Sequence, residues 1–255
     1  MVKSNVVPGK KIIAFILTYN CAHMLEKAWR KIPKDYVDEI VVSDDMSKDN
    51  AIEVARSLGL KIIQNRGKKG YGGNLKNALA YCFDHGASHA VEIHGDGAQF
   101  DPIAIKDAVP LIKKNYDLIL GSRFQVPGQA LKNGMPLVRF LANRGLSFFD
   151  RIILDLPLTE FHTGFRIYSK KLFETLPLKH DANNYLFSFE VIVQAAYFKL
   201  KIGEVPVEAD YKSEHTSHNL IGASIYAFNT FYILFKFLSS KYKIAFSKQF
   251  PDIKL

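Results

Sequence analysis

Two acidic motifs follow segments that have the pattern of buried β-strands. Asp96 stands in the sequence His94-Gly95-Asp96-Gly97 after the apolar segment 88–93, and Asp44 and Asp45 follow the apolar segment 39–42. The glycines beside Asp96 allow a ligand to approach the backbone closely. In open α/β sheets, ligands bind outside the carboxyl ends of the strands, so these carboxylates indicate a ligand site. Taken alone, the Asp96 turn is more typical of an ordinary surface turn with a capping Asp than of a ligand site.

A glycine-rich basic loop, residues 65–74, precedes a helical pattern with apolar residues at 75, 78, 79 and 82. Backbone N–H groups, the positive end of a helix and nearby lysines together suit a phosphate group. The glycine spacing is neither that of a P-loop nor that of the dinucleotide fingerprint. A flexible surface loop without a ligand is therefore the open alternative.

Alternating strands and helices must position these motifs. The apolar segment 12–17 predicts a central strand buried on both faces, and further strands are expected at 39–42, 61–63, 88–93, 117–120 and 201–207. Helices are expected at 21–30, 49–58, 103–111 and 136–154. This alternation predicts an α/β fold with a mostly parallel sheet and right-handed crossovers. Pro206 places the last strand at a sheet edge.

Composition limits the class of protein. The chain has 255 residues, a hydrophobic fraction of 48% and a formal net charge of +9, which suit a globular domain with a basic surface. A basic surface favours phosphate-bearing ligands or an anionic membrane, and it is also common in proteins with neither. No aromatic and basic interleaving supports nucleic-acid binding. Cys21 and Cys82 form no metal or disulfide pattern, so we expect buried thiols. The first ten residues lack a signal-peptide pattern, so we expect a cytoplasmic location.

The C-terminal region is rich in aromatic residues. Residues 221–238 carry six Phe or Tyr side chains but are interrupted by polar residues, and basic residues follow as far as Lys248. A bilayer-spanning helix needs roughly 20 apolar residues, so 221–248 is expected to lie at a membrane interface or to pack on protein. The protein partner in the second case is its own domain or the other subunit of a homodimer.

Taken together, the motifs resemble those of glycosyltransferase family 2, in the branch of dolichyl-phosphate mannosyltransferase and other polyprenyl-phosphate glycosyltransferases. Their order along the chain, from about residue 11 to residue 219, carries the resemblance. The motifs are Thr18-Tyr19-Asn20, Ser43 to Asp49, Gly70-Tyr71-Gly72, His94 to Gly97, Gly121 to Phe124 and Thr163 to Tyr168. The resemblance implies a GT-A fold, a single Rossmann-like sheet flanked by helices, and an inverting transfer from a UDP- or GDP-linked sugar.

The resemblance also implies a donor site and a divalent metal, Mg²⁺ or Mn²⁺. Asp96 matches the last acid of the family's Asp-x-Asp motif and would bind the metal. His94 replaces the first acid, and imidazole suits Mn²⁺ better than Mg²⁺. The expected nucleotide-sugar site consists of Thr18, Tyr19, Asn20, Asp44, Asp45, Gly70, Tyr71, Gly72, Gly95 and Asp96.

Acceptor residues follow from the same resemblance. Asp96, Arg123 and Glu160 are the expected catalytic residues, and the acceptor phosphate is expected to meet Arg123, Arg166, Lys212 and Ser217. A lipid phosphate is already anionic and needs no general base, whereas a hydroxyl acceptor needs a carboxylate. Glu160 and Asp101 are the candidates for that base. The alternatives are that Glu160 is solvated and that Asp101 only caps a helix.

The expected organisation is a glycosyltransferase domain at 1–219 and a C-terminal hydrophobic helix with a basic tail at 220–255. The domain divides into a nucleotide-binding half, about 10–123, and an acceptor half, about 124–219. The most favoured acceptor is a polyprenyl phosphate, with peripheral attachment to the cytoplasmic face of a membrane. The alternatives are a saccharide hydroxyl acceptor in cell-surface glycan synthesis and a nucleotide-sugar-binding protein that does not turn over.

Overall fold

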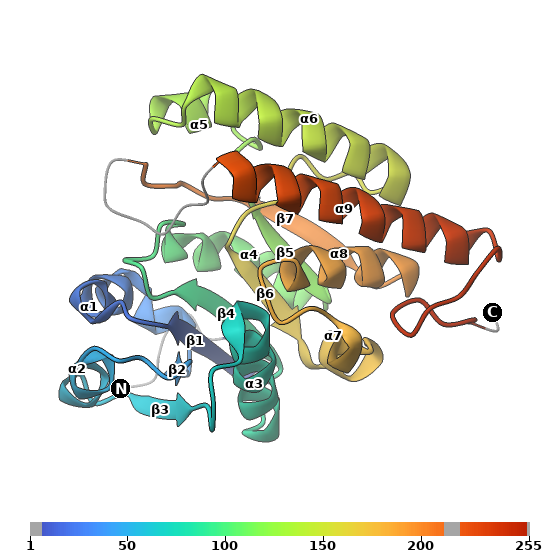
Figure 1. The fold of residues 1–255 in the computed structure, drawn as a ribbon. Coiled ribbons are helices and arrows are strands. Elements are labelled where there is room, and N and C mark those ends of the chain that lie inside the picture. The colour runs from blue at the N-terminus through green and yellow to red at the C-terminus, as the bar shows by residue number, and fades with distance from the viewer. Residues whose placement is uncertain (1–6, 212–219, 254–255) are drawn as a thin grey trace.

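A single twisted sheet forms the centre of the computed structural model, which describes residues 7–211 and 220–253 (Figure 1). Within these residues the sheet has seven strands in the order β3-β2-β1-β4-β6-β5-β7. Strand β6 runs antiparallel to both of its neighbours, and the other pairings are parallel. The predicted mostly parallel sheet is therefore confirmed. The strands are β1 Ile12–Thr18, β2 Glu39–Asp44, β3 Lys61–Gln64, β4 His89–His94, β5 Leu118–Ser122, β6 Arg166–Ser169 and β7 Ile202–Pro206.

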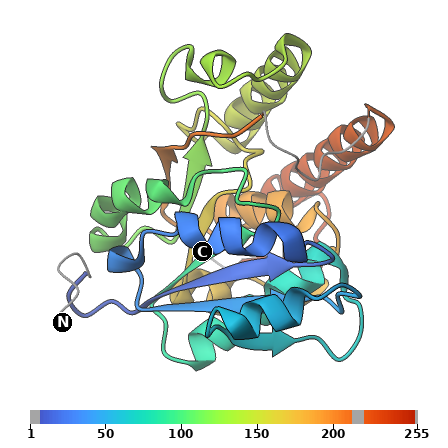
Figure 2. The same ribbon diagram turned by 90° about the vertical axis from the view of Figure 1, so that its left-hand side faces the viewer.

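Helices cover both faces of the sheet (Figures 1 and 2). Side chains of β1 alternate between two cores, because successive residues of a strand point to opposite faces. Ile13 and Phe15 pack with α3 and α8, whereas Ile12 and Ala14 pack with α1 and α4. The helices are α1 Ala22–Lys31, α2 Ala51–Ser57, α3 Gly70–Asp84, α4 Ile105–Lys113, α5 Gln129–Lys132, α6 Leu137–Leu154, α7 Lys170–Thr175, α8 Phe187–Tyr197 and α9 Leu220–Lys241.

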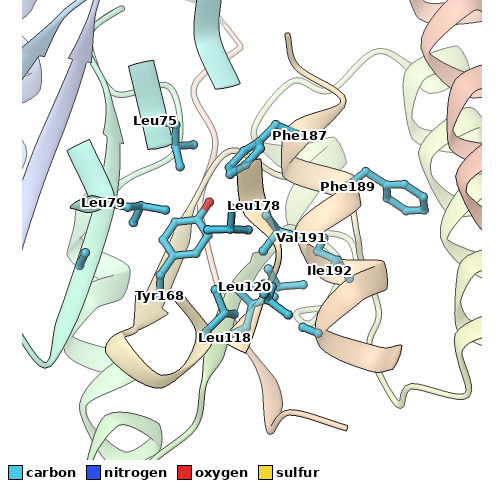
Figure 3. Close-up of a cluster of buried hydrophobic side chains, with 14 of the residues drawn as sticks. Leu75, Leu79, Leu118, Leu120, Tyr168, Leu178, Phe187, Phe189, Val191 and Ile192 are labelled. Atoms are coloured by element: carbon cyan, nitrogen blue, oxygen red, sulfur yellow. The ribbon is translucent and has the colours of Figure 1, made fainter. Parts of the chain in front are cut away.

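The larger core lies between β4, β6, β5 and the helices α3 and α8. Figure 3 shows the ring of Tyr168 surrounded by leucines of α3 and β5, with Phe187 and Val191 of α8 on the other side. Tyr168 is completely buried, and its hydroxyl donates to Oε2 of Glu92 at 2.6 Å. An apolar core can hold this phenol because its one polar atom has a partner.

Several local predictions are confirmed. Oδ1 of Asp101 accepts a hydrogen bond from the N–H of Ile103 at 2.9 Å, so this residue caps the helical segment as expected. A short 3₁₀ turn, Pro102–Ala104, precedes α4. Pro206 ends the edge strand β7. Cys21 and Cys82 are buried thiols, and burial raises their pKa values to about 11 and about 12.

The aromatic C-terminal helix α9 packs against α8 and belongs to the larger core. Its inner face buries Ile233, Leu234 and Phe237. The chain then turns back, and Phe250 is completely buried against Tyr197 and Phe237. Residues 220–253 thus share one core with the sheet.

Two buried carboxylates hold the chain after α9. Nε2 of Gln249 donates to Oδ1 of Asp181 at 2.9 Å and to Oε1 of Glu190 at 2.8 Å. Gln194 also donates to Oδ1 of Asp181. Burial, assisted by the nearby charge of Glu190, raises the pKa of Asp181 from an ordinary 3.8 to about 7. The folded state therefore favours the protonated form of Asp181.

We predict that Asp181 makes folding pH-dependent. Between about pH 4 and pH 7 the folded state binds more protons than the unfolded state at this residue. Its contribution to the free energy of unfolding is therefore complete below about pH 4 and is lost as the pH rises to about 7. Asp181→Asn should flatten this decrease in urea unfolding measured from pH 4 to pH 8. Glu174→Gln, at an exposed carboxylate of α7, is the control, and an unchanged pH dependence in Asp181→Asn would contradict the prediction.

Candidate active site

The carboxyl ends of β2, β1 and β4 form one rim of the sheet. Thr18 lies opposite Asp44, and Leu17 lies opposite His94 in the parallel register. The Asp96 turn continues from β4, and the N–H of Gly95 donates to the carbonyl of Leu17 at 2.9 Å. A Cβ atom on Gly95 would lie 2.6 Å from that oxygen, so only glycine allows this approach. The structure thus brings three of the predicted motifs together.

The loops after β1 and β2 are tied to each other. Asn20, with a φ of 50°, accepts a hydrogen bond on Oδ1 from the N–H of Lys48 at 2.7 Å. Both oxygens of Asp44 accept hydrogen bonds from Ser47, one from its N–H and one from its hydroxyl. Asp44 is completely buried and shapes the loop that follows β2. A ligand at this rim therefore meets a loop whose backbone is already fixed.

Asp45 closes the start of α3. Its Oδ1 accepts from the N–H of Lys69 at 2.7 Å, and its Oδ2 accepts from the N–H of Gly70 at 2.8 Å. The N–H of Gly72 donates to the carbonyl of Asn183 at 2.9 Å. These three N–H groups were expected to be open to a phosphate, and in the structure the protein itself occupies them.

The glycines of this loop are required by packing rather than by a ligand. A Cβ atom on Gly70 would lie 2.6 Å from the carbonyl oxygen of Asn183, and one on Gly72 would lie 2.6 Å from that of Ala182. Tyr71 also points inward, and its hydroxyl contacts Glu92 and Ser188. The expected nucleotide contacts from Gly70, Tyr71 and Gly72 are therefore replaced by contacts to the segment before α8 and to the core.

The predicted donor residues fall into two groups. Thr18, Asp44, Asp45 and Gly95 are buried and shape the rim, whereas Tyr19 and Asn20 face solvent and Asp96 is half-buried. Nζ of Lys68 lies 2.8 Å from the hydroxyl of Tyr19 and 4.0 Å from the centre of its ring. This contact lowers the pKa of Tyr19 and holds a cation at the rim.

A buried polar cluster lies beneath His94. Glu92 is completely buried in β4 and contacts Tyr71, Tyr168 and Arg166. Nε2 of His94 lies 3.1 Å from Oε1 of Glu92. Burial alone would lower the pKa of His94, but the contact with Glu92 outweighs it and raises the pKa. This nitrogen is therefore directed to Glu92 and engaged within the protein.

The role of Glu92 was not predicted from the sequence. The available signal was a single acid inside the apolar segment Ala90-Val91-Glu92-Ile93. Buried charges are rare without partners, so a buried Glu92 predicts a nearby cation and several hydrogen-bond donors. Arg166 supplies the cation from β6, with Nη1 at 3.8 Å from Oε2 of Glu92. Arg166 was expected to bind the acceptor phosphate, but it is nearly fully buried beside this carboxylate.

Arg123 and Glu160 form a second buried ion pair. Oε2 of Glu160 accepts from the N–H of Arg123 at 2.7 Å, and Oε1 accepts from Nε of Arg123 at 2.8 Å. Nη1 of Arg123 donates to the hydroxyl of Tyr211 at 2.8 Å. The attraction of Glu160 outweighs the cost of burial and raises the pKa of Arg123. The alternative of a solvated Glu160 is wrong, because this side chain is completely buried.

Further cations surround this pair. The guanidinium of Arg139 lies 5.4 Å from the ring of Tyr211, and that of Arg144 lies 5.4 Å from the ring of Phe124. Both arginines belong to α6, where their positions among apolar residues were visible in the sequence. Lys212 and Ser217, the remaining predicted acceptor residues, lie outside the described residues.

The segment after β7 holds the end of the Asp96 turn. The carbonyl of Gln99 accepts from the N–H of Asp210 at 2.9 Å, and the N–H of Asp101 donates to the carbonyl of Glu208 at 2.9 Å. Tyr185, in the segment before α8, also lies near this rim. Burial and the charge of Asp96 raise its pKa. A surface cavity of about 250 Å³ lies beside Gln99, Asp101 and Asp210. Gln99 and Tyr185 were not predicted as site residues.

The donor set at Asp96 suits a metal completed by substrate. Over residues 7–211 and 220–253, no three His, Cys, Asp or Glu side chains gather as a metal-binding group. Mg²⁺ and Mn²⁺ are commonly bound by one or two carboxylates together with substrate phosphates, so a single carboxylate at the rim is compatible with either ion.

The fold and the rim define an α/β protein whose ligand site lies where parallel strands end. The family model for Glycosyl transferase family 2 matches residues 13–176, and the chain belongs to this family and is a glycosyltransferase.

Relatives cover most of the chain. It is 28% identical to a UDP-N-acetylglucosamine–dolichyl-phosphate N-acetylglucosaminyltransferase of Methanococcus voltae, over 85% of this chain and 94% of the relative. It is 25% identical to an undecaprenyl-phosphate mannosyltransferase of Micrococcus luteus, over 84% and 91%. A glucosyl-3-phosphoglycerate synthase from Mycobacterium tuberculosis, solved with Mn²⁺, UDP and phosphoglyceric acid, superposes with a TM-score of 0.66. That structure is 17% identical over 96% of this chain and 80% of its own, and supports the GT-A fold.

We predict that Arg123 and Glu160 depend on each other in the folded protein. Removing one partner of a buried ion pair leaves an uncompensated charge and costs about 3–5 kcal/mol. Glu160→Gln and Arg123→Gln should each lower the free energy of unfolding by this order in urea titrations. The double variant should lose much less than the sum of the two single losses. Additive losses would contradict a direct pairing.

Proposed function

We propose that the protein transfers a sugar, with inversion, from a nucleoside-diphosphate sugar to a polyprenyl phosphate. Family membership supports the reaction class. Two relatives, a dolichyl-phosphate and an undecaprenyl-phosphate transferase, support the acceptor class. The proposal includes either a uridine or a guanosine donor, because the rim residues do not distinguish the two bases.

The convergence of Thr18, Asp44 and Asp96 at the ends of adjacent parallel strands carries this proposal. A nucleotide placed at this rim would lie over the fixed loops after β1 and β2, with Tyr19, Asn20 and Lys68 within reach on the solvent side. Its diphosphate would lie toward Asp96. This placement of the nucleotide agrees with the general position of ligands at the carboxyl ends of strands in open α/β sheets.

A divalent metal held by Asp96 would neutralise the charge that develops on the departing diphosphate. The carboxylate of Asp96 would supply the protein ligand, and His94 would contribute only if its contact with Glu92 were broken. Lys68 would add a cation to the same region. The solved relative that carries Mn²⁺ with UDP supports a metal of this kind.

The state of the two candidate bases favours a phosphate acceptor. Glu160 is engaged by three donor groups of Arg123, and Asp101 accepts from the N–H of Ile103. A hydroxyl acceptor needs a base within hydrogen-bond reach. The carboxylate of Glu160 is not available in this arrangement, and Asp101 already uses one oxygen as a helix cap. A lipid phosphate carries its negative charge already, since the second pKa of a phosphate monoester is about 6.

We predict transfer to lipid phosphate that depends on Asp96. The full chain would be incubated with radiolabelled UDP- or GDP-sugars, Mg²⁺ or Mn²⁺ and detergent-dispersed polyprenyl phosphate, and label in the organic phase would be counted. At least one donor should label the lipid. Asp96→Asn should reduce the rate by about 10²–10³-fold, the typical effect of losing one electrostatic contact to the transition state.

Asp107→Asn, at an exposed carboxylate of α4, is the matched control and should retain full activity. The proposal fails if no donor labels the lipid phase or if Asp96→Asn transfers at the wild-type rate. Label found only in a soluble saccharide acceptor would overturn the proposed polyprenyl-phosphate acceptor and leave the reaction class intact.

A further inference from the structure

Four ring side chains form a row beside the Asp96 turn. The ring of Tyr185 stacks on the ring of Tyr71, with centroids 4.9 Å apart and planes at 29°. Tyr71 meets His94 edge to face at 5.8 Å, and His94 meets Phe100 in the same way at 6.3 Å. These side chains come from the segment before α8, from α3, from β4 and from the end of the Asp96 turn. We name them the aromatic row.

The aromatic row ends at a cation. The guanidinium of Arg123 lies 5.5 Å from the centre of the Phe100 ring. Within the row, His94 precedes Asp96 by two residues, so the row passes beside the place proposed for the diphosphate of the donor. The transferred sugar is bonded to that diphosphate. A donor bound at the rim would therefore bring its sugar within reach of the aromatic row.

Tyr185 is the exposed end of the aromatic row. Its side chain is 43% exposed, whereas those of Tyr71, His94 and Phe100 are half-buried. Stacking on Tyr71 covers one face of the Tyr185 ring, and the exposed fraction leaves ring surface for a ligand. Burial and the charge of Asp96 raise the pKa of Tyr185, which agrees with a position near the proposed metal ligand.

The segment that carries Tyr185 is fixed by hydrogen bonds on both sides of this residue. Before it, the N–H of Ala182 donates to Oε2 of Glu190 at 2.7 Å. Around it, Oδ1 of Asn184 accepts from the N–H of Leu186 at 2.9 Å. A ring that is already held in place loses less conformational entropy on binding a ligand than a free side chain does.

The glycine motif at the start of α3 makes this position of Tyr185 possible. A Cβ atom on Gly70 or on Gly72 would lie 2.6 Å from a carbonyl oxygen of the segment before Tyr185. The N–H of Gly72 also donates to the carbonyl of Asn183 in that segment. Tyr71, between the two glycines, is anchored in the core through its hydroxyl. The motif that was expected to contact the nucleotide thus supports the ring of Tyr185.

We propose that the ring of Tyr185 packs against the sugar of the bound donor, so that the site binds a nucleotide-sugar more tightly than the free nucleotide. A pyranose ring presents C–H groups between its hydroxyls, and an aromatic ring offers a rigid apolar surface for them. His94, at the position where the family motif has an acid, takes part as a member of the row. The inference rests on the proposed donor site, since Asp96 must hold the diphosphate for the sugar to reach Tyr185.

The isoprenoid chain of the acceptor is the other apolar group in the proposed reaction. It fits Tyr185 less well, because the cations that suit its phosphate lie at the opposite end of the aromatic row. These cations are Arg123, beside Phe100, and Arg139, whose guanidinium lies 5.4 Å from the ring of Tyr211. The sugar of the donor is bonded to the diphosphate and therefore lies closer to Tyr185.

Calorimetric titration of the full chain with Mn²⁺, without an acceptor, tests the proposal. The ligands are UDP, GDP, UDP-N-acetylglucosamine, UDP-glucose and GDP-mannose, and each nucleotide is compared with its own sugar conjugates. The wild type should bind at least one conjugate more tightly than the free nucleotide. Tyr185→Leu should weaken binding of that conjugate about tenfold and leave binding of the nucleotide unchanged. Tyr185→Phe keeps the ring and should bind both as the wild type does.

Two further variants make the result specific. Tyr185→Met also covers Tyr71 without a ring, so it should behave as Tyr185→Leu does and guards against a folding defect in one variant. Tyr242→Leu, at an exposed tyrosine beyond α9, is the matched control and should change neither dissociation constant.

Three results would overturn the proposal. The first is a wild type that binds no conjugate more tightly than the free nucleotide. The second is equal affinity of the wild type and both ringless variants for the conjugate. The third is an equal loss for nucleotide and conjugate in both variants, which would give Tyr185 a structural role only. Ringless variants that raise only the KM for polyprenyl phosphate would show an isoprenoid contact instead.

The donor titration separates this proposal from the reaction. A chain whose affinity for the sugar conjugate depends on Tyr185, but that transfers no sugar to polyprenyl phosphate, would retain the role of Tyr185 and overturn the proposed function. A chain that transfers sugar to lipid phosphate, while its ringless variants bind the donor as the wild type does, would do the reverse.

Discussion

The close approach of the Asp96 turn to the end of β1 organises the candidate active site. Parallel pairing of β1 with β2 and β4 aligns their carboxyl ends, but alignment alone leaves the turns free to diverge. The hydrogen bond from the N–H of Gly95 to the carbonyl of Leu17 holds the Asp96 turn against the end of β1. This contact is possible only because residue 95 has no side chain. Thr18, Asp44 and Asp96 then share one rim. The site thus depends on backbone geometry before it depends on any charged side chain.

Buried charge sets the second constraint. Glu92 and Glu160 are both completely buried, and each has an arginine and at least one tyrosine hydroxyl within its cluster. The desolvation cost of such a pair offsets much of the attraction between its charges. The pairs therefore contribute more to fixing the geometry than to the net free energy of folding. Glu92 holds β4 to the antiparallel strand β6, and Glu160 holds the loop before β6 to the end of β5. The two pairs together tie β4, β5 and β6 to one another, although β6 lies far along the sequence from β4.

Much of the fold was predictable because its signals are local. The apolar segment 12–17 indicates a strand buried on both faces, Asp101 and Pro102 indicate a helix start, and Pro206 indicates a sheet edge. The rim was predictable as well, since the carboxyl ends of parallel strands must lie together. The partners of the glycine loop were not predictable, because Asn183 meets Gly70 and Gly72 only after α8 has packed on the sheet. The roles of Glu92, Arg166 and Glu160 were missed for the same reason, since strand β6 enters between β4 and β5 from far along the sequence.

The central claim is that the rim formed by β2, β1 and β4 binds a nucleoside diphosphate through a metal at Asp96. Calorimetric titration of UDP and GDP into the full chain, with Mn²⁺ or with a chelator, tests it most directly. We predict that at least one of the two binds in the presence of Mn²⁺ and that the chelator or Asp96→Asn weakens this binding by tenfold or more, about 1.4 kcal/mol. Equal binding by the wild type and Asp96→Asn, or no binding of either nucleotide, would contradict the claim.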